Sequence, residues 1–447
     1  MSMLNIGTSA LNTTQASLAT TSHNISNVNT DGYNRQRAEQ VTFPPNFQGT
    51  HYIGSGVTVG GVERIYDSFL GSQVREYTSS ESQQDTFLTF SKQVDDLLGS
   101  PELGLNTGLE EFFNSVHGVA NDPTSIPARQ VMITQGGLLA DRFNTLDKQL
   151  SEFDKQIDNT LSVAVKDINN LSQGIADLNE AIIVGTTSSG AVPNDLLDQR
   201  DQLINQLSEF VSVSTLNESN GSISVFIGSG QALVVGNTQI DLSQIDDTST
   251  TPIRVSIGYG PTNADIAAQL SGGIVGGAFQ VRTEVVDSAR TELDLLAESV
   301  VAAFNDAHDD GVDLDNVAGG NFFDPTNLTA GSISVILTDP RKVAASSTSN
   351  PGVGNNENAL ALAALQTDDT TVTVGASTRS FGDQYGVTVS GVATRTHQAD
   401  IAQQTQQGLL NQVNLRYDSV SGVNLDEEAA NLIKFQQAYQ AASQIIT

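Results

Sequence analysis

Apolar side chains recur every seven residues through the first thirty positions of the chain. The stretch holds no Asp, Glu, Lys or Arg and is otherwise rich in Ser, Thr and Asn. The spacing predicts a helix with a heptad seam, and the composition predicts that this helix is marginal in water. We therefore expect it to be mobile in the free monomer and to become ordered when a partner covers the seam. The seam residues are Leu4, Leu11, Leu18, Ile25 and Val28.

A second apolar stripe with the same spacing lies at the other end of the chain. Asn424 followed by Glu427 resembles a capping box, and the acidic residues beside them suit the positive end of a helix. Two amphipathic helices at opposite chain ends are expected to pair with each other or with copies in neighbouring subunits. The C-terminal stripe consists of Leu425, Leu432, Tyr439 and Ile446.

Long helices are predicted between the two ends. Residues 137–184 carry apolar positions at alternating steps of three and four, with one extra step of four that indicates a coiled-coil stutter. This apolar run would span roughly 66 Å at the helical rise, so we expect a rod. Residues 66–98 and 278–307 are expected to pack beside it, and residues 383–418 to form a further helix.

The period changes to alternation in residues 210–260. Ile223, Val225 and Ile227 alternate with polar residues directly after Asn220-Gly221, a strong hairpin signal. Further short strands are expected at 233–235, 240–242 and 253–257. The Gly- and Asp-rich residues 311–379 are expected to be irregular, with strands at 332–337 and 371–374.

Together these patterns predict an α+β multidomain fold, with paired terminal helices and a long helical-bundle rod that carries an inserted small β-domain. The 447 residues exceed the roughly 250–300 at which one core usually splits. The expected domains are a terminal inner-core helical region (1–65 with 420–447), a helical rod (66–200 with 276–310 and 380–419), a β-domain (201–275) and an irregular segment packed on either of the last two (311–379).

Charge and composition exclude several classes of partner. The net charge is −31, from 20 basic and 51 acidic residues, so neither nucleic acid nor an anionic membrane surface is an expected partner. Without Cys there are no disulfides and no thiolate sites. Residues 1–30 lack the pattern of a cleavable signal peptide, and no run of 18 apolar residues occurs. The protein is thus either cytoplasmic or exported without a cleaved signal.

No catalytic, cofactor-binding or metal-binding motif is found, so we do not expect an enzyme or a cofactor. The acidic stretch 306–315 loosely resembles the start of a calcium loop. Its twelfth position would be Val317, where a bidentate Glu is needed. A surface turn is therefore favoured over a cation site.

Both chain ends carry motifs of a known protein group. Residues 23–33, HNISNVNTDGY, resemble the N-terminal signature of flagellar rod, hook and hook-associated proteins, and residues 421–432, SGVNLDEEAANL, resemble the matching C-terminal signature. The signature positions are Asn24, Asn27, Asn29, Gly32, Tyr33, Gly422, Asn424, Glu427 and Glu428.

The middle of the chain resembles the hook-associated protein 1 family in particular. The similar segments are residues 121–125 followed by Arg129, residues 138–143, 195–203 and 359–365, and residues 311–314 with Phe322-Phe323. The last of these also favours a family loop over a calcium site. Two features depart from the family: Asp31 replaces the usual Pro, and the chain ends at Thr447, roughly four helical turns early. We therefore expect part of the terminal helix pairing to be missing.

The resemblance implies a structural subunit that joins the flagellar hook to the filament, assembles through its N- and C-terminal helices and acts as a mechanical adaptor. Implied partners are copies of itself in a ring, the hook protein, the next hook-associated protein toward the filament and a cytoplasmic export chaperone on the C-terminal segment. The implied location is the extracellular hook–filament junction, reached by flagellar type III export. Another axial protein, a hook or rod subunit, is the alternative. A second alternative is an exported adhesin or hydrolase that uses the β-domain. It is disfavoured, because residues 210–260 contain no catalytic constellation.

Overall fold

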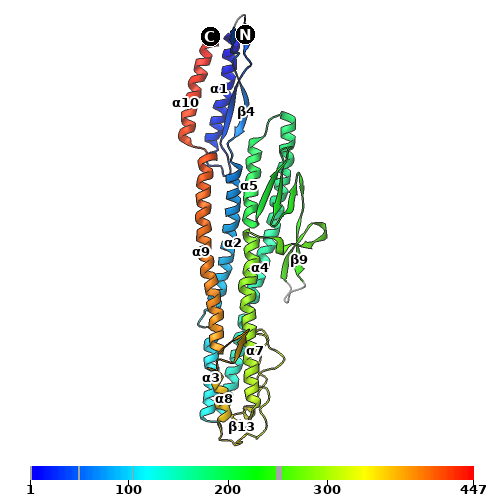
Figure 1. Ribbon diagram of the computed structural model, residues 1–447, viewed down its shortest axis with the longest axis vertical. Coiled ribbons are helices and arrows are strands. Elements are labelled where there is room, and N and C mark those ends of the chain that lie inside the picture. Colours follow the sequence, from blue (N-terminus) through cyan, green and yellow to red (C-terminus); the bar gives the residue numbers. More distant parts are fainter. Residues whose placement is uncertain (1–2, 49–50, 103, 248–253, 447) are drawn as a thin grey trace. The chain divides into compact units, whose positions relative to one another are not determined.

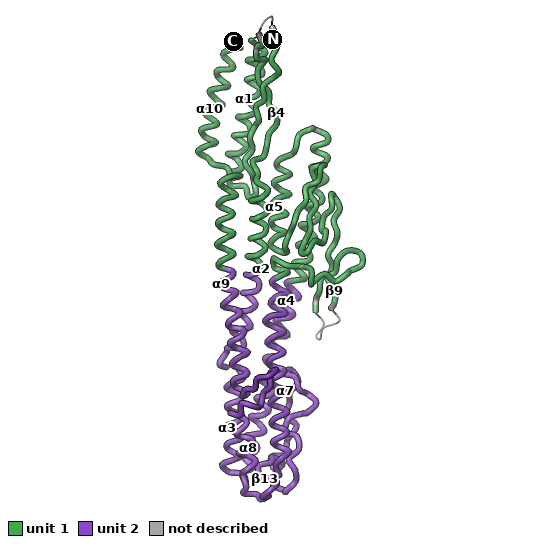
Figure 2. Tube along the Cα trace, in the orientation of Figure 1, with its two compact units in different colours: residues 1–83, 161–276, 404–447 green, residues 84–160, 277–403 purple. Residues whose placement is uncertain are grey.

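The computed structural model describes residues 3–48, 51–102, 104–247 and 254–446. They form two compact units (Figure 2). Unit 1 combines residues 1–83, 161–276 and 404–447, and unit 2 combines residues 84–160 and 277–403. Long helices and several small sheets together confirm the predicted α+β multidomain class. Residues of both units lie in α2 (Ser68–Leu98), α4 (Ile126–Ser189) and α9 (Phe381–Ser421).

The two terminal helices of unit 1 lie side by side (Figure 1), which confirms their predicted pairing. The N-terminal helix also packs against a hairpin of two antiparallel strands. Residues 1–65 were expected to be a helical region, but four strands lie between Gln36 and Arg64. Their side chains are mostly polar and half-exposed, so they carry no alternating apolar pattern. The elements are α1 (Met3–Ser26), β1 (Gln36–Thr42), β2 (Asn46–Gln48), β3 (His51–Ile53), β4 (Val57–Arg64) and α10 (Leu425–Ile446).

Unit 1 also contains the predicted β-structure. The hairpin signal at Asn220-Gly221 joins β5 to β6, and Gly221 takes a φ of +89° there. The strands expected at 223–227 and 233–235 are confirmed as β6 and β7. The strand expected at 240–242 is not found at that place: β8 ends at Gln239 and β9 begins at Leu242. The strand expected at 253–257 is found as β10, which begins at Arg254; Ile253 lies outside the described residues.

Two antiparallel sheets make up this β-structure. One has the order β5-β6-β7-β8 and the other β11-β10-β9, and α5 precedes them in the chain. The bounds are α5 (Asn194–Phe210), β5 (Val213–Asn217), β6 (Ile223–Ile227), β7 (Gln231–Val235), β8 (Thr238–Gln239), β9 (Leu242–Asp247), β10 (Arg254–Tyr259) and β11 (Ala264–Asp265), with 3₁₀ turns at Gly260–Thr262 and Ala267–Gln269.

Two asparagines attach the sheets to α4. Asn179 Nδ2 donates to the carbonyls of Ile223 (2.8 Å) and Gly236 (2.6 Å), and its Oδ1 accepts from Ile223 N (3.1 Å). Asn169 exchanges hydrogen bonds with the backbone of Leu242 in the same way, at 2.8 and 2.9 Å. Each amide side chain thus pairs with a strand as another strand would, and buried peptide groups are satisfied.

The core of unit 2 is a cluster of aromatic rings. Phe112 and Phe304 lie with their centroids 5.0 Å apart, and both contact Phe322 and Phe323. The helices expected at 66–98, 137–184, 278–307 and 383–418 are confirmed, although a π-turn (Arg282–Asp287) divides the third. The remaining helices here are α3 (Leu105–Asn121), α6 (Gly273–Val281), which begins in unit 1, α7 (Ser288–Asp309) and α8 (Glu357–Ala364), with a 3₁₀ turn at Pro340–Lys342.

The largely irregular segment 311–379 differs from expectation at one strand. The strand expected at 371–374 is confirmed as β14, but the one expected at 332–337 is reduced to a single antiparallel bridge between Val335 and Phe323. Ser332 N and Ile333 N both donate to Thr329 O, at 3.0 and 2.9 Å, and so form a turn. The pairs here are β12 (Gly311–Val312) with β13 (Ser346–Ser347) and β14 (Val372–Val374) with β15 (Ser377–Arg379).

Candidate functional site

The predicted assembly residues remain accessible on the surface of the α1–α10 pair. Leu4 is 53% exposed and Leu425 is 50% exposed, and Tyr439 is also exposed. The others are half-buried, so the chain leaves its two apolar stripes incompletely covered. The half-buried positions are Leu11, Leu18, Ile25, Val28, Leu432 and Ile446.

The buried face of α1 is made of small and mostly polar residues instead. At Gly7 an added Cβ would lie 2.9 Å from Cγ1 of Ile446, so glycine permits this close approach to α10. The hydroxyls of Thr14 and Ser17 donate to carbonyls one turn earlier in α1, at 2.7 and 3.0 Å, which satisfies them in the interface. The small residues at every seventh position, Gly7, Thr14 and Thr21, mark this face in the sequence as the second position of the heptad seam.

Asn24 connects the end of α1 to the start of α10. Its Nδ2 donates to Gln36 O (2.8 Å) and to Glu428 Oε2 (3.2 Å). Its Oδ1 accepts from Tyr33 OH (2.8 Å) and from Gln36 N (3.0 Å). Burial, followed by nearby carboxylates, raises the pKa of Tyr33, so its hydroxyl stays a donor. All four hydrogen-bonding positions of this buried amide are therefore used.

Arg35 joins the same network to two signature glutamates. Its Nε donates to Glu428 Oε1 (2.7 Å) and its Nη1 to Glu427 Oε2 (2.6 Å). The Glu428 side chain is 2% exposed and that of Glu427 is 58% exposed. Asn424 caps α10 as predicted, since its Oδ1 accepts from the backbone N–H groups of Asp426 and Glu427 at 3.0 and 3.3 Å. The Glu427 carboxylate, expected to complete the capping box, binds Arg35 instead, in a hydrogen bond between two charged groups.

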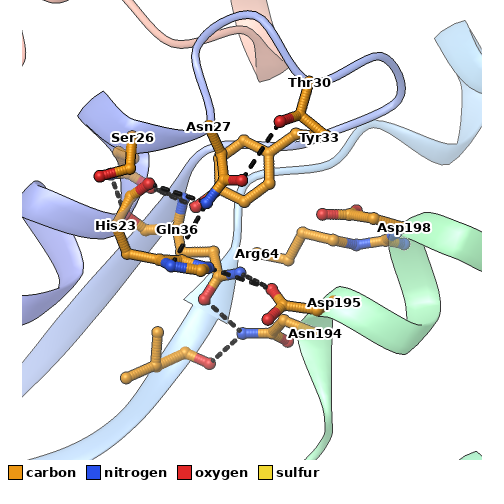
Figure 3. Close-up of polar contacts among 12 residues, drawn as sticks. His23, Ser26, Asn27, Thr30, Tyr33, Gln36, Arg64, Asn194, Asp195 and Asp198 are labelled. Atoms are coloured by element: carbon orange, nitrogen blue, oxygen red, sulfur yellow. Dashed lines mark hydrogen bonds and ion pairs between the residues drawn. The ribbon is translucent and has the colours of Figure 1, made fainter.

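Residues 27–33, the signature loop, follow the end of α1 (Figure 3). Asn27 Nδ2 donates to His23 O at 3.0 Å, and its Oδ1 accepts from the Thr30 hydroxyl at 3.2 Å. Gly32 takes a φ of +77°, which disfavours residues with a side chain. Asn29 and Asp31 are exposed, so the replacement of the family's usual Pro by Asp31 occurs at the surface.

Behind the loop, the chain is held to α5 by a row of aspartates. Asn34 donates from its backbone N (3.1 Å) and its Nδ2 (2.6 Å) to the carboxylate of Asp198. Arg64 Nη1 donates to Asp198 (2.9 Å) and Asp201 (2.7 Å), and Gln36 Nε2 donates to Asp195 Oδ1 at 2.7 Å. Burial raises the pKa of Asp198, although these donors oppose the shift.

The sequence analysis did not predict this contact between the aspartates of α5 and the donors Asn34, Gln36 and Arg64. The signal that could have found them is the spacing of three between Asp195, Asp198 and Asp201, which places the carboxylates on one helix face. Such a face needs a basic or amide partner, and the segment Asn34–Gln36 supplies one.

The signature Gly422 lies at the end of α9. Its N–H donates to Asp418 O at 2.9 Å, and an added Cβ would lie 2.5 Å from that oxygen. Just before it, Ser421 O accepts from Arg35 N at 2.8 Å. Gly422 therefore permits a tight helix end where the N-terminal segment crosses.

The acidic stretch is held by its own chain. Asp313 accepts from Lys342 Nζ (2.9 Å) and from the backbone N–H groups of Asp315 (2.7 Å) and Val317 (3.0 Å). In the part of the chain that the structure describes, no three His, Asp or Glu side chains gather where they could hold a metal ion. Among those same residues, no helix is long and apolar enough to cross a membrane. What the signature residues do in this structure is to join segments that lie far apart in the sequence, through the hydrogen bonds of Asn24 and Arg35 to Glu428.

Comparison with family models matches three parts of the chain. Residues 91–323 match the flagellar hook-associated protein FlgK helical domain. Residues 4–34 match the flagella basal body rod protein family, and residues 416–447 match the flagellar basal body rod FlgEFG protein C-terminal family. The two terminal matches contain α1 and α10, with the signature loop.

Known relatives match over nearly their whole length. The flagellar hook-associated protein 1 of Escherichia coli (strain K12) is 28% identical, over 100% of this chain and 97% of that protein. The protein of the same name from Bacillus subtilis (strain 168) is 29% identical, over 98% of this chain and 94% of that protein. The flagellar hook junction protein FlgK from Burkholderia pseudomallei shares the fold, with a TM-score of 0.70 and 19% identity over 78% of this chain and 100% of that chain.

The hook-associated family model covers more than half of the chain, and the model matches at the two ends are to other flagellar structural proteins. This is a family of flagellar structural proteins and not an enzyme family. The chain belongs to the family of flagellar hook-associated protein FlgK.

Proposed function

We propose that this protein joins the flagellar hook to the filament, and that it assembles with its neighbours through the exposed apolar stripes of α1 and α10. One observation carries the proposal. The pair formed by these helices leaves Leu4, Leu425 and Tyr439 exposed, although these residues belong to its heptad stripes. Apolar stripes on a helix pair are buried efficiently by further helices packed at heptad spacing.

The polar network prepares this surface for assembly. Asn24, Arg35 and Glu428 fix the end of α1 to the start of α10, so the two stripes are presented in one register. A surface that is already ordered at one end loses less conformational entropy when it binds than two separate helices would. The first turns of α1, beyond these bonds, are then the part that a neighbour orders.

The proposed partners follow from the location. They are copies of this chain in a ring, the hook protein on one side and the next hook-associated protein toward the filament on the other. Each domain has its own place in the proposed assembly. The terminal region (1–65 with 420–447) forms the inner layer of the assembly, the helical rod the next layer, and the β-domain (201–275) faces outward.

Export is the remaining part of the proposal. The chain leaves the cell unfolded through the flagellar type III channel, without a cleaved signal, and a cytoplasmic chaperone holds the C-terminal segment before export. An uncharged N-terminal segment and many uncharged polar residues suit this passage. The functional location is then the extracellular hook–filament junction.

Electron microscopy of a strain that lacks this protein tests the function. We expect hooks without filaments, with monomeric flagellin in the medium, and recovery of filaments when the gene is returned. Missing hooks would favour the alternative, a hook or rod subunit, and normal filaments would contradict both.

A further inference from the structure

A buried arginine of unit 1 has no acceptor among the described residues. Arg75 of α2 is 7% exposed, and no described side chain or carbonyl accepts a hydrogen bond from its guanidinium or pairs with its charge. The guanidinium carries five N–H donors and a permanent charge. The side chain lies mostly within the protein and its nitrogens open onto a groove, so the donors are free to bind an acceptor from outside the chain.

Arg75 lines two adjoining cavities, of about 900 Å³ and about 570 Å³. Ser72 and Thr215 line both cavities with it, so the two form one groove between α2 and β5. Two other arginines reach this groove, and both have acceptors within the chain: Arg64 Nη1 donates to Asp198 and Asp201, and Arg200 Nη1 donates to Asn179 Oδ1 and Gly221 O.

The other wall of the groove is the free edge of a sheet. β5 is the outer strand of the order β5-β6-β7-β8. Gly228 N donates to Ser212 O, and Glu218 N donates to Ser222 O, so the even-numbered residues of this strand bond to β6. The alternation of an antiparallel ladder then directs the N–H and C=O groups of the odd-numbered residues to the free edge. These residues are Val213, Thr215 and Asn217.

We propose that this groove receives an extended segment from a second copy of this chain, which pairs with the free edge of β5 and places a carboxylate on Arg75. An added strand satisfies the backbone groups of an exposed edge, and a carboxylate matches the planar fork of arginine with two parallel bonds. Glu76 and Glu218 also line the groove, so the complementarity is confined to Arg75, which a single carboxylate matches. A second copy is the occupant we favour, since the chain carries 51 acidic and only 20 basic residues and so offers many such carboxylates. The inference rests on the proposed function, because it requires copies held next to each other.

A photoreactive residue in the groove tests the proposal in the assembled protein. The full chain with p-benzoylphenylalanine in place of Thr215 is expressed in the deletion strain, and isolated flagella are irradiated. We expect a covalent product with the mass of two copies, and mass spectrometry should place the link in an extended segment that contains Asp or Glu. Arg75→Gln should lower the yield about tenfold, the loss expected for one charge-assisted hydrogen bond.

Two variants serve as controls. Lys148→Gln makes the same charge change on an exposed side chain of unit 2 and should leave the yield unchanged. Arg75→Lys keeps the charge without the planar fork and should give an intermediate yield. A purified Arg75→Gln chain should unfold at the wild-type temperature or above it, because no acceptor within the chain is lost. A lower unfolding temperature would show that Arg75 is an internal structural residue and would overturn the proposal.

The remaining outcomes distinguish failure of the groove proposal from failure of the proposed function. Flagella with filaments but without a two-copy product, or with a product only to a different protein, overturn the groove proposal and leave the proposed function intact. An unchanged two-copy yield in Arg75→Gln overturns the role of the carboxylate. A deletion strain that builds normal filaments removes the proposed function itself.

Discussion

Asn24 and Glu428 are separated by 404 positions in the sequence and share a hydrogen bond of 3.2 Å between Asn24 Nδ2 and Glu428 Oε2. The bond joins the last turn of α1 to the first turn of α10. Both side chains are buried, and Arg35 supplies the countercharge to Glu428. The packing of the two chain ends is therefore fixed by a specific polar contact as well as by apolar area.

Asn24→Ala should open the contact between α1 and α10. It leaves the buried groups of Tyr33, Gln36 and Glu428 without one partner each, which costs roughly 2–4 kcal/mol in the free energy of local opening. Amide hydrogen exchange of α1 and α10 measures this as loss of protection. Asn29→Ala, on the same loop but exposed, is the matched control and should change nothing.

Arg35→Ala should destabilise the contact between α1 and α10 more than a substitution of Glu427, the exposed partner of Arg35, does. It leaves the carboxylate of Glu428 buried without a countercharge, at a cost of roughly 3 kcal/mol. Glu427→Gln removes a bond at the surface and should cost less than about 1 kcal/mol. A double-mutant cycle of Arg35→Ala and Glu427→Gln, measured by hydrogen exchange, separates the contributions of the two glutamates. Equal costs for the two single substitutions would contradict the buried role of Glu428.

Gly7→Leu should force α1 away from α10, whereas Gly7→Ala needs only a small shift of the Ile446 side chain. The chain has no Cys, so spin labels at Asn12→Cys and Gln440→Cys report one distance between the helices. We expect this distance to increase by several ångströms in Gly7→Leu and to stay near the wild-type value in Gly7→Ala. Gln15→Leu, on the exposed side of α1, controls for added bulk.

His308 should make unit 2 less stable in acid. Its Nε2 accepts from Ala344 N at 3.0 Å, so Nδ1 carries the proton and lies 2.7 Å from Gly320 O. Burial lowers the pKa of this histidine below its ordinary value of about 6.5. The unfolded chain then binds the proton more readily, so stability is complete above about pH 6.5 and falls as the pH decreases below it.

Urea unfolding at several values between about pH 7.5 and pH 5, followed by a signal from unit 2, measures how the stability of this unit depends on pH. His308→Gln should flatten it, because the remaining histidines described in unit 2, His117 and His397, are exposed. A slope that survives this substitution would assign the acid sensitivity to other groups.

The sequence predicts most of the helices because their determinants are local. The apolar positions of α4 recur at steps of three and four for most of its length, and the turn at Asn220-Gly221 is a two-residue signal. The hairpin of β1 and β4 could not be predicted in this way. Its strands owe their stability to α1, which covers them, and this contact appears only in the fold.

The candidate site was predicted only in part for the same reason. Asn24 and Glu428 were found as signature positions, but their contact depends on the whole chain between them. The strand expected at 332–337 is reduced to one bridge, because a turn at Thr329 binds the N–H groups of its first two residues. The small residues of α1 were visible as a period of seven, but their burial against the rest of unit 1 appears only in the fold.

Replacement of the two most exposed residues of the predicted stripes, by Leu4→Ser together with Leu425→Ser, tests the account most directly. Deletion of residues 1–25 would also remove Asn24, whereas these substitutions leave the polar network in place. In the deletion strain, with Asn29→Ser as control, we predict a secreted subunit with the wild-type spin-label distance, hooks without filaments and flagellin in the medium. Filaments at the wild-type number would contradict assembly through these stripes.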